Sequence, residues 1–231
     1  MALPTAEYHK IIGAHFAESG KPEVAEAQAK YMRHQFQFYG LKSPERRLIT
    51  KSIFQEIGWP TVEQLPEFVE MAWAADYRDW QMLGLDLMEK YIKKVPKDFI
   101  FLLEKLIITK SWWDTVDMLA GKLVARHFQR FPEMIPKFPN GWMDSNNIWL
   151  QRSALIFQLK YRDQTNVQLL FDYILKLKDS DEFFIQKAAG WALREYSKRD
   201  WQIVLDFMDE NNLPPLTKRE GLKWMKSKGV L

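Results

Sequence analysis

The sequence of 231 residues contains no cysteine, which excludes disulfide bonds and thiolate chemistry. No apolar run approaches the ~20 residues that a membrane helix needs, and the first residues lack the basic and then apolar pattern of an export signal. We therefore expect a cytoplasmic protein. Metal-ligand spacing such as HExxH is also absent, so we expect no metal and no cofactor. The histidines are His9, His15, His34 and His127.

A large excess of one charge is missing too, because the formal net charge is only +3. A value this small does not establish an anionic partner, so the distribution of Lys and Arg matters more than their sum. The basic residues gather in "KSPERR" near residue 45 and, in the last third of the chain, in "QKAAGWALREYSKR" and "TKREGLKWMKSK". Such clusters are usually solvated helix faces, and a nucleic-acid partner needs further support.

Strand-like alternation is scarce, whereas apolar residues recur at steps of three and four, which predicts an all-α protein. Gly40 follows a segment, 22–39, that reads as helical. Ser43 then offers the N-cap of a new helix with a proline in its first turn. Near the end, Thr217 and Glu220 have the spacing of a capping box at the start of a basic last helix.

An aromatic residue that anchors a helical segment recurs along the middle of the chain, at intervals of about 33 to 36 residues. A helix-turn-helix unit of a solenoid occupies about this length. We therefore predict a HEAT-like helical-repeat superhelix (an α-solenoid) with a concave binding face, formed by a single domain over residues 1–231. The anchors are Trp80, Trp113, Trp149 and Phe184.

Four residues after each anchor, three of the repeats carry a small residue and one carries a carboxylate. An unpaired buried carboxylate is costly, so a departure of this kind is typical of a functional site. The alternative is an ordinary ion pair with a nearby Lys or Arg. The four residues are Gly84, Asp117, Ser153 and Ala188.

Three residues after the anchor, the last two repeats turn basic with Arg152 and Lys187, which adds both to the candidate DNA-binding residues. Trp191 lies on the same helical stripe as Arg194, so an aromatic face should lie beside a cation. Most tryptophans are core residues, and we assign that role to Trp80, Trp142 and Trp149.

Four longer segments together resemble the AlkD-type DNA alkylation-repair glycosylases, a HEAT-like family, over nearly the whole chain. The resemblance implies that Trp113, Asp117 and Trp191 lie in a catalytic cleft. It also implies DNA contacts for five residues: Tyr31, Ser43, Arg47, Arg152 and Arg194. The segments are "AKYMRHQFQFYGLKSPERR" from Ala29, "TKSWWDTVD", "NIWLQRSALIFQLKY" and "EFFIQKAAGWALREY".

Such enzymes hydrolyse the N-glycosidic bond of N3- or N7-alkylated purines in duplex DNA, and the resemblance implies the same activity for a monomer acting at the bacterial nucleoid. The residues fit this chemistry, because a cationic purine is a good leaving group and needs a carboxylate to stabilise the sugar cation. The motif holds no lysine nucleophile, so we expect no strand cleavage. Two alternatives stay open: a noncatalytic module that binds a DNA structure, and a scaffold for a protein or RNA. Ser43 could equally belong to an ordinary capped helix.

Overall fold

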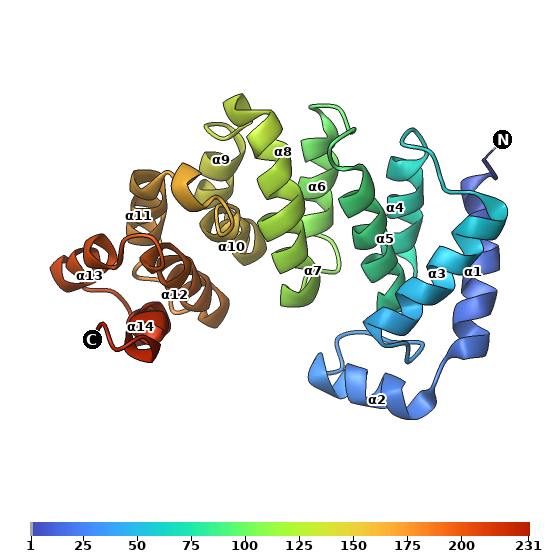
Figure 1. Ribbon diagram of the computed structural model, residues 1–231, viewed down its shortest axis with the longest axis horizontal. Helices are drawn as coiled ribbons and strands as arrows, with labels where there is room; N and C mark the ends of the chain where they lie inside the picture. The colour runs from blue at the N-terminus through green and yellow to red at the C-terminus, as the bar shows by residue number, and fades with distance from the viewer. Residues whose placement is uncertain (1) are drawn as a thin grey trace. The chain divides into compact units, whose positions relative to one another are not determined.

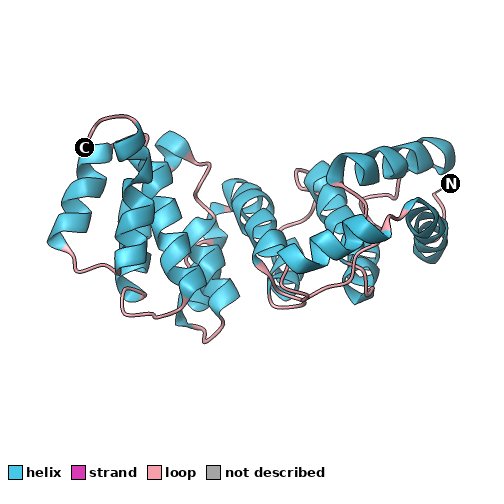
Figure 2. Cartoon of the chain, turned by 90° about the horizontal axis from the view of Figure 1, so that it is seen from below, coloured by secondary structure: helices cyan, strands magenta, loops and turns pink. Residues whose placement is uncertain are grey.

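The computed structural model describes residues 2–231, and its secondary structure is helical (Figure 1). Residues 2–231 form no strand; one isolated bridge joins Gln37 and Tyr77, and Figure 2 accordingly shows helices and loops. The predicted all-α class is confirmed, and a helical repeat is consistent with it. Over the same residues, no helix combines the length and apolarity needed to cross a bilayer. The chain divides into two compact units, Met1–Pro96 and Lys97–Leu231.

The first unit is built around one face of its first helix. Tyr8, Ile12 and Phe16 recur every four residues and are fully buried. This stripe lies on α1, which packs against α3 and α4, while α4 pairs with α5. The helices of this unit are α1 (Thr5–Ser19), α2 (Pro22–Tyr31), α3 (Ser43–Ile57), α4 (Leu65–Ala74) and α5 (Arg78–Tyr91).

Helix α2 ends eight residues before the predicted end at position 39, so this part of the sequence interpretation is wrong. Arg33 and His34 both adopt left-handed backbone conformations, with φ of 55° and 56°, which an α-helix cannot continue through. The chain beyond them is held by the start of α5: Tyr39 stacks on Tyr77 at 4.0 Å, and its amide donates to Asp79. Aromatic packing and this hydrogen bond replace the helical bonds that the periodicity suggested.

The second unit contains a long rod in which α7 and α8 are joined by a π-helix, η1 (Figure 1). Helix α10 packs against α9 and α12, and α12 lies along α14. Its other elements are α6 (Phe99–Ile107), α7 (Trp113–Met118), η1 (Leu119–Val124), α8 (Ala125–Arg130), η2 (Pro132–Met134), α9 (Phe138–Asp144), α10 (Ile148–Ile156), η3 (Arg162–Gln164), α11 (Val167–Lys176), α12 (Phe183–Ser197), α13 (Trp201–Glu210) and α14 (Pro215–Ser227).

Helix α14 begins at Pro215, two residues before the predicted cap, so Thr217 and Glu220 form no capping box. The Thr217 hydroxyl instead donates to the carbonyl oxygen of Gln186 on α12, at 3.1 Å. The carboxylate of Glu220 forms ion pairs with cationic side chains instead of capping the helix. Proline suits the first position of a helix because the amide it lacks would be unpaired there, which explains the earlier start.

Candidate functional site

The predicted anchors each lie within the first three residues of a helix. Trp80 is in α5, Trp113 begins α7, Trp149 is second in α10, and Phe184 is second in α12. The residues that recur in the repeat pattern therefore occupy equivalent places in their helices. In the second unit the three anchored helices bring their first turns into one neighbourhood, which positions the candidate site.

The two adjacent tryptophans at the start of α7, the cap residue Trp112 and the first helical residue Trp113, have different environments. Trp112 packs against the rings of Trp149 and Phe184, with centroid distances of 5.8 and 5.3 Å. Trp113 lines a pocket, as does Trp191 from α12. Trp112 thus stabilises the contact between the starts of α7, α10 and α12. Trp113 faces the pocket that lies beside this contact.

This site pocket has a volume of about 360 Å³ and combines aromatic surfaces with charged groups of both signs. The structure brings together Trp113, Asp117 and Trp191, the three residues for which the family resemblance implied a catalytic cleft. It adds three of the predicted DNA-binding cations to the same walls. The full lining is Trp113, Asp117, Arg152, Phe183, Phe184, Lys187, Trp191, Arg194 and Glu220.

Asp117 forms a two-point ion pair with Arg152. The Arg152 Nε donates to Asp117 Oδ1 at 2.7 Å, and its Nη2 donates to Oδ2 at 2.9 Å. The third guanidinium nitrogen, Nη1, donates to the carbonyl oxygen of Phe184 at 2.7 Å. The side chain of Arg152 is 5% exposed and that of Asp117 is 20% exposed. The carboxylate is therefore the partner that is more accessible from the pocket. Such planar pairing fixes the carboxylate in one orientation.

The ion pair that the sequence offered as the alternative reading of Asp117 is therefore present, and it lines the pocket. A carboxylate has about four lone-pair positions, and Arg152 occupies two of them. The remaining positions allow the same group to face a substrate or a water molecule. Pairing with Arg152 and a role in the pocket are compatible.

Glu220 is a buried member of the pocket wall that the sequence reasoning missed as a site residue. Its Oε1 accepts from the Lys187 and Lys223 ammonium groups at 2.6 Å each, and its Oε2 lies 3.3 Å from Arg194. Burial acts to raise the pKa of Glu220, but the hydrogen bonds from Lys187 and Lys223 outweigh it, and the pKa is lowered. The segment "TKREGLK" contains one partner, Lys223, three residues after Glu220, but it gives no sign of Lys187 and Arg194, which come from another helix.

Phe183 and Phe184 also line the pocket. Phe184 was found as a repeat anchor, whereas its role in holding Arg152 through a backbone carbonyl has no sequence signal. Phe183 is 53% exposed, which is high for a large apolar side chain. The sequence alone gives no sign that Phe183, rather than its neighbour Phe184, is the exposed ring.

A π-helix begins two residues after Asp117, at Leu119, and ends at Val124. π-Helical turns are rare and are frequently found at functional sites. The widened turn packs against α6 and α10, the helix that supplies Arg152. It sets the rotation of Asp117 relative to the helix that follows.

The other predicted DNA-binding residues, Tyr31, Ser43 and Arg47, lie in the first unit. Tyr31, 69% exposed, and Ser43 line a smaller pocket of about 210 Å³. Ser43 was predicted as the cap of α3 but is its first residue, because the helix begins one position earlier; the cap residue Lys42 makes no side-chain cap bond. Arg47 donates to both oxygens of Asp86, at 2.8 to 3.2 Å, and stays 55% exposed. The neighbouring Arg46 binds the same carboxylate from a buried position.

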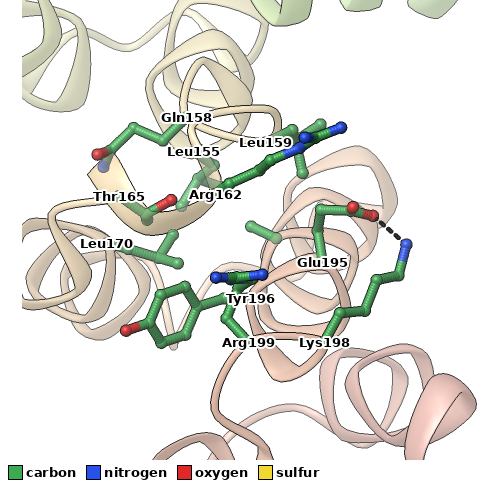
Figure 3. Close-up of a pocket in the computed structure, with 11 residues that line it drawn as sticks. Leu155, Gln158, Leu159, Arg162, Thr165, Leu170, Glu195, Tyr196, Lys198 and Arg199 are labelled. Carbon is green, nitrogen blue, oxygen red and sulfur yellow. Dashed lines mark hydrogen bonds and ion pairs between the residues drawn. The ribbon is translucent and has the colours of Figure 1, made fainter.

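A further pocket of the second unit, about 240 Å³, lies among α10, α11 and α12 (Figure 3). Leu155, Leu159 and Leu170 form its apolar lining, and Glu195 at its rim is joined to Lys198 by an ion pair (Figure 3). Its composition is that of a crevice between packed helices. A search of residues 2–231 for three His, Asp or Glu side chains able to share a metal ion finds no such group.

The fold and the pocket define a helical protein that holds an oriented carboxylate between indole rings and cations. The family model for DNA alkylation repair enzymes matches residues 12–225, and the chain belongs to this family. A solved structure, titled a predicted DNA alkylation repair enzyme from Enterococcus faecalis, is 33% identical with a TM-score of 0.82, covering 89% of this chain and 96% of that one. Among curated proteins no sequence matches significantly. A role in DNA alkylation repair follows from the family.

Proposed function

We propose that this protein is a monofunctional DNA glycosylase that hydrolyses the N-glycosidic bond of cationic N3- or N7-alkylated purines in duplex DNA. The product is an abasic site with an intact strand. The observation that carries the proposal is the oriented carboxylate of Asp117 in a pocket lined by Trp113 and Trp191.

The proposed reaction depends on the charge of the substrate. Alkylation at N3 or N7 leaves the purine cationic, so it departs without a strong general acid. As the bond breaks, positive charge develops on the sugar, and Asp117 stabilises it and orients the attacking water. The preorganised pair with Arg152 keeps the carboxylate from rotating, so little reorganisation is needed in the transition state.

The indole rings supply selection for a positive charge. A cation over an indole face gains about 0.5 to 2 kcal/mol, whereas a neutral base lacks this term. Trp113 and Trp191 suit this role because both are half-buried and line the pocket beside Asp117. Arg47, Arg152, Lys187 and Arg194, with Tyr31 and Ser43, are proposed to contact the DNA backbone or the lesion.

The test is Asp117→Asn, assayed on a duplex that carries one N7-methylguanine, with enzyme in saturating excess and abasic sites detected by alkaline cleavage. The excision rate should fall by ~10² or more, while duplex affinity changes little, because the carboxylate acts mainly in the transition state. The variant also weakens an ion pair to a buried arginine, so melting temperature is measured on the same preparation.

Asp86→Asn is the matched control. It makes the same chemical change in a carboxylate of the first unit that also pairs with a buried arginine, Arg46. Asp86 holds Arg47 as well, a proposed DNA contact, so the comparison uses the rate at saturating enzyme, which does not depend on affinity. Asp86→Asn should lower the melting temperature by a similar amount and keep the saturated excision rate. Near-normal excision by folded Asp117→Asn would end the catalytic assignment.

A noncatalytic DNA-binding module is the second candidate, favoured by the pairing of Asp117 with Arg152. In that case Asp117 is structural, and the wild-type protein binds duplex in a salt-sensitive manner without forming abasic sites. A scaffold for a protein or RNA would show neither property.

A further inference from the structure

Two acidic residues line the site pocket, Asp117 and Glu220, and Glu220 is the more buried of them. Its side chain is 3% exposed, compared with 20% for Asp117. Lys187 and Arg194, the two cations of α12 that share it, are 38% and 28% exposed. The carboxylate therefore lies beneath the cations, which are the groups that an incoming ligand would meet.

Close packing of two helices places this carboxylate. A Cβ atom added at Gly190 of α12 would lie 2.5 Å from the Cβ of Glu220 and 2.7 Å from the carbonyl oxygen of Thr217. The missing side chain lets α14 approach α12 more closely than any other residue would permit. The hydrogen bond from Thr217 to Gln186 fixes the same contact. Glu220 is thus rigidly placed on the pocket side of α14.

The charges around Glu220 do not balance. Three cations, Lys187, Arg194 and Lys223, share one carboxylate, which leaves an excess of two positive charges. An ammonium group has three N–H donors and a guanidinium has five. Each of the three cations uses one donor on Glu220. The remaining donors and the excess charge suit an anion with several acceptor oxygens, such as a phosphodiester.

We infer that Glu220 is a positioning residue that holds Lys187 and Arg194 as a preformed clamp for a DNA backbone phosphate beside the pocket. This inference rests on the proposed function of the pocket. Without Glu220 both long side chains lose the acceptor that orders them. In such a variant, DNA binding would have to order both side chains, and this entropic cost would lower the affinity. In the wild-type protein Glu220 orders them before DNA binds.

The experiment compares Glu220→Gln with wild type by measuring the Kd for an undamaged duplex at fixed salt. Affinity should fall about tenfold, the effect expected from ordering two long side chains. The same substitution is then made in a Lys187→Gln, Arg194→Gln background, where it should have no further effect. Glu195→Gln is the matched control, because Glu195 lies on α12 and pairs with Lys198 away from this pocket.

Two results would overturn the inference. Tighter binding by Glu220→Gln would mean that the carboxylate merely opposes DNA by its charge. An equal loss of affinity in both backgrounds would mean a structural role, because the effect would not pass through the two cations. If Glu220→Gln folds poorly, Glu220→Asp keeps the charge and withdraws the oxygens by one methylene. Positioning predicts weaker binding by that variant, whereas a charge effect predicts no change.

The inference and the proposed function can fail separately. A wild-type protein that binds duplex but forms no abasic sites would refute the glycosylase activity and leave the clamp in place. A wild-type protein that excises the lesion, with Glu220→Gln binding normally, would refute the clamp alone.

Discussion

His127, a fully buried histidine, has two ring nitrogens in unequal surroundings. Its Nε2 lies 3.0 Å from the carbonyl oxygen of Lys97 and must carry the proton, since a carbonyl only accepts. Its Nδ1 is buried and has no hydrogen-bond partner among the described residues. Burial lowers the pKa of His127, assisted by Arg130 and opposed by the bond to Lys97 and by two nearby carboxylates.

This asymmetry predicts acid sensitivity. The unfolded chain takes up a proton near pH 6.5, whereas the folded chain resists it, so the stability from neutral His127 is complete above about pH 6.5 and is lost as pH falls below that value. The loss is at most ~1.4 kcal/mol per pH unit. His127→Gln keeps the donor to Lys97 and should flatten the fall in melting temperature between pH 7.5 and 5.5. The exposed His15→Gln serves as control, and equal pH profiles for wild type and His127→Gln would refute this account.

Single residues of the site were predictable where their departure from the repeat was local. Asp117 differed from the small residues at its repeat position, and Trp191 lay on a stripe with Arg194, so both were found and both line the pocket. Glu220 was not found as a site residue, because its role depends on cations that approach from α12 across a helix contact. Sequence spacing describes one helix at a time and gives no information on the side chains of a neighbouring helix.

At the scale of elements, the contact between α12 and α14 depends on one glycine. Gly190→Ala should destabilise the protein by ~1 to 3 kcal/mol, because the neighbouring Thr217 carbonyl is backbone and cannot move aside cheaply. This corresponds to several degrees in melting temperature. The control is Gly141→Ala in α9, where an added Cβ meets no atom within 4 Å and alanine should gain up to ~1 kcal/mol. A Gly190→Ala protein as stable as wild type would show that α14 adjusts freely.

Two helix starts were predicted closely and one helix end was misplaced. Ser43 and Thr217 were predicted as caps from local chemistry, and α3 and α14 begin at or within two residues of them. The end of α2 was misplaced because two non-glycine residues, Arg33 and His34, hold left-handed conformations, and the segment that follows them packs against the start of α5. Tertiary contacts of this kind leave no trace in the local pattern.

For the whole molecule, the proposed DNA contacts come from both compact units, with Arg47 in the first and Lys187 in the second. Each phosphate contact adds about 0.9 to the slope of log Kd against log salt. Arg47→Ala and Lys187→Gln should each flatten the slope by about one, and the double variant by about two. Arg47→Ala should leave stability within ~0.5 kcal/mol, since its pair with Asp86 is half exposed. Unchanged slopes would remove these residues from the DNA-binding surface.

The sequence predicted the all-α class correctly because helical periodicity is a property of every segment. It also predicted a single domain over residues 1–231, which stays a prediction. The division of the contacts near residue 96 has no counterpart in composition or in a glycine-rich or proline-rich linker. The density of contacts is a property of the folded chain, and the repeat spacing gives no information on where along the chain that density decreases.

The π-helix after Asp117 has a consequence for how this region tolerates change. A π-helical turn holds about one residue more than an α-helical turn, so Leu119–Val124 stores an extra residue within an otherwise regular rod. Removing that residue would restore α-helical geometry and leave α7 and α8 in nearly the same relative rotation, whereas removing a residue from the regular helix on either side would turn one end by about 100° and take Asp117 away from Arg152. Gly121 has open space around it and can change its side chain without such a rotation. The register of the site therefore tolerates the loss of one residue within this segment but not within the regular helix on either side, so among related sequences a one-residue gap is a sign of a lost site only outside Leu119–Val124.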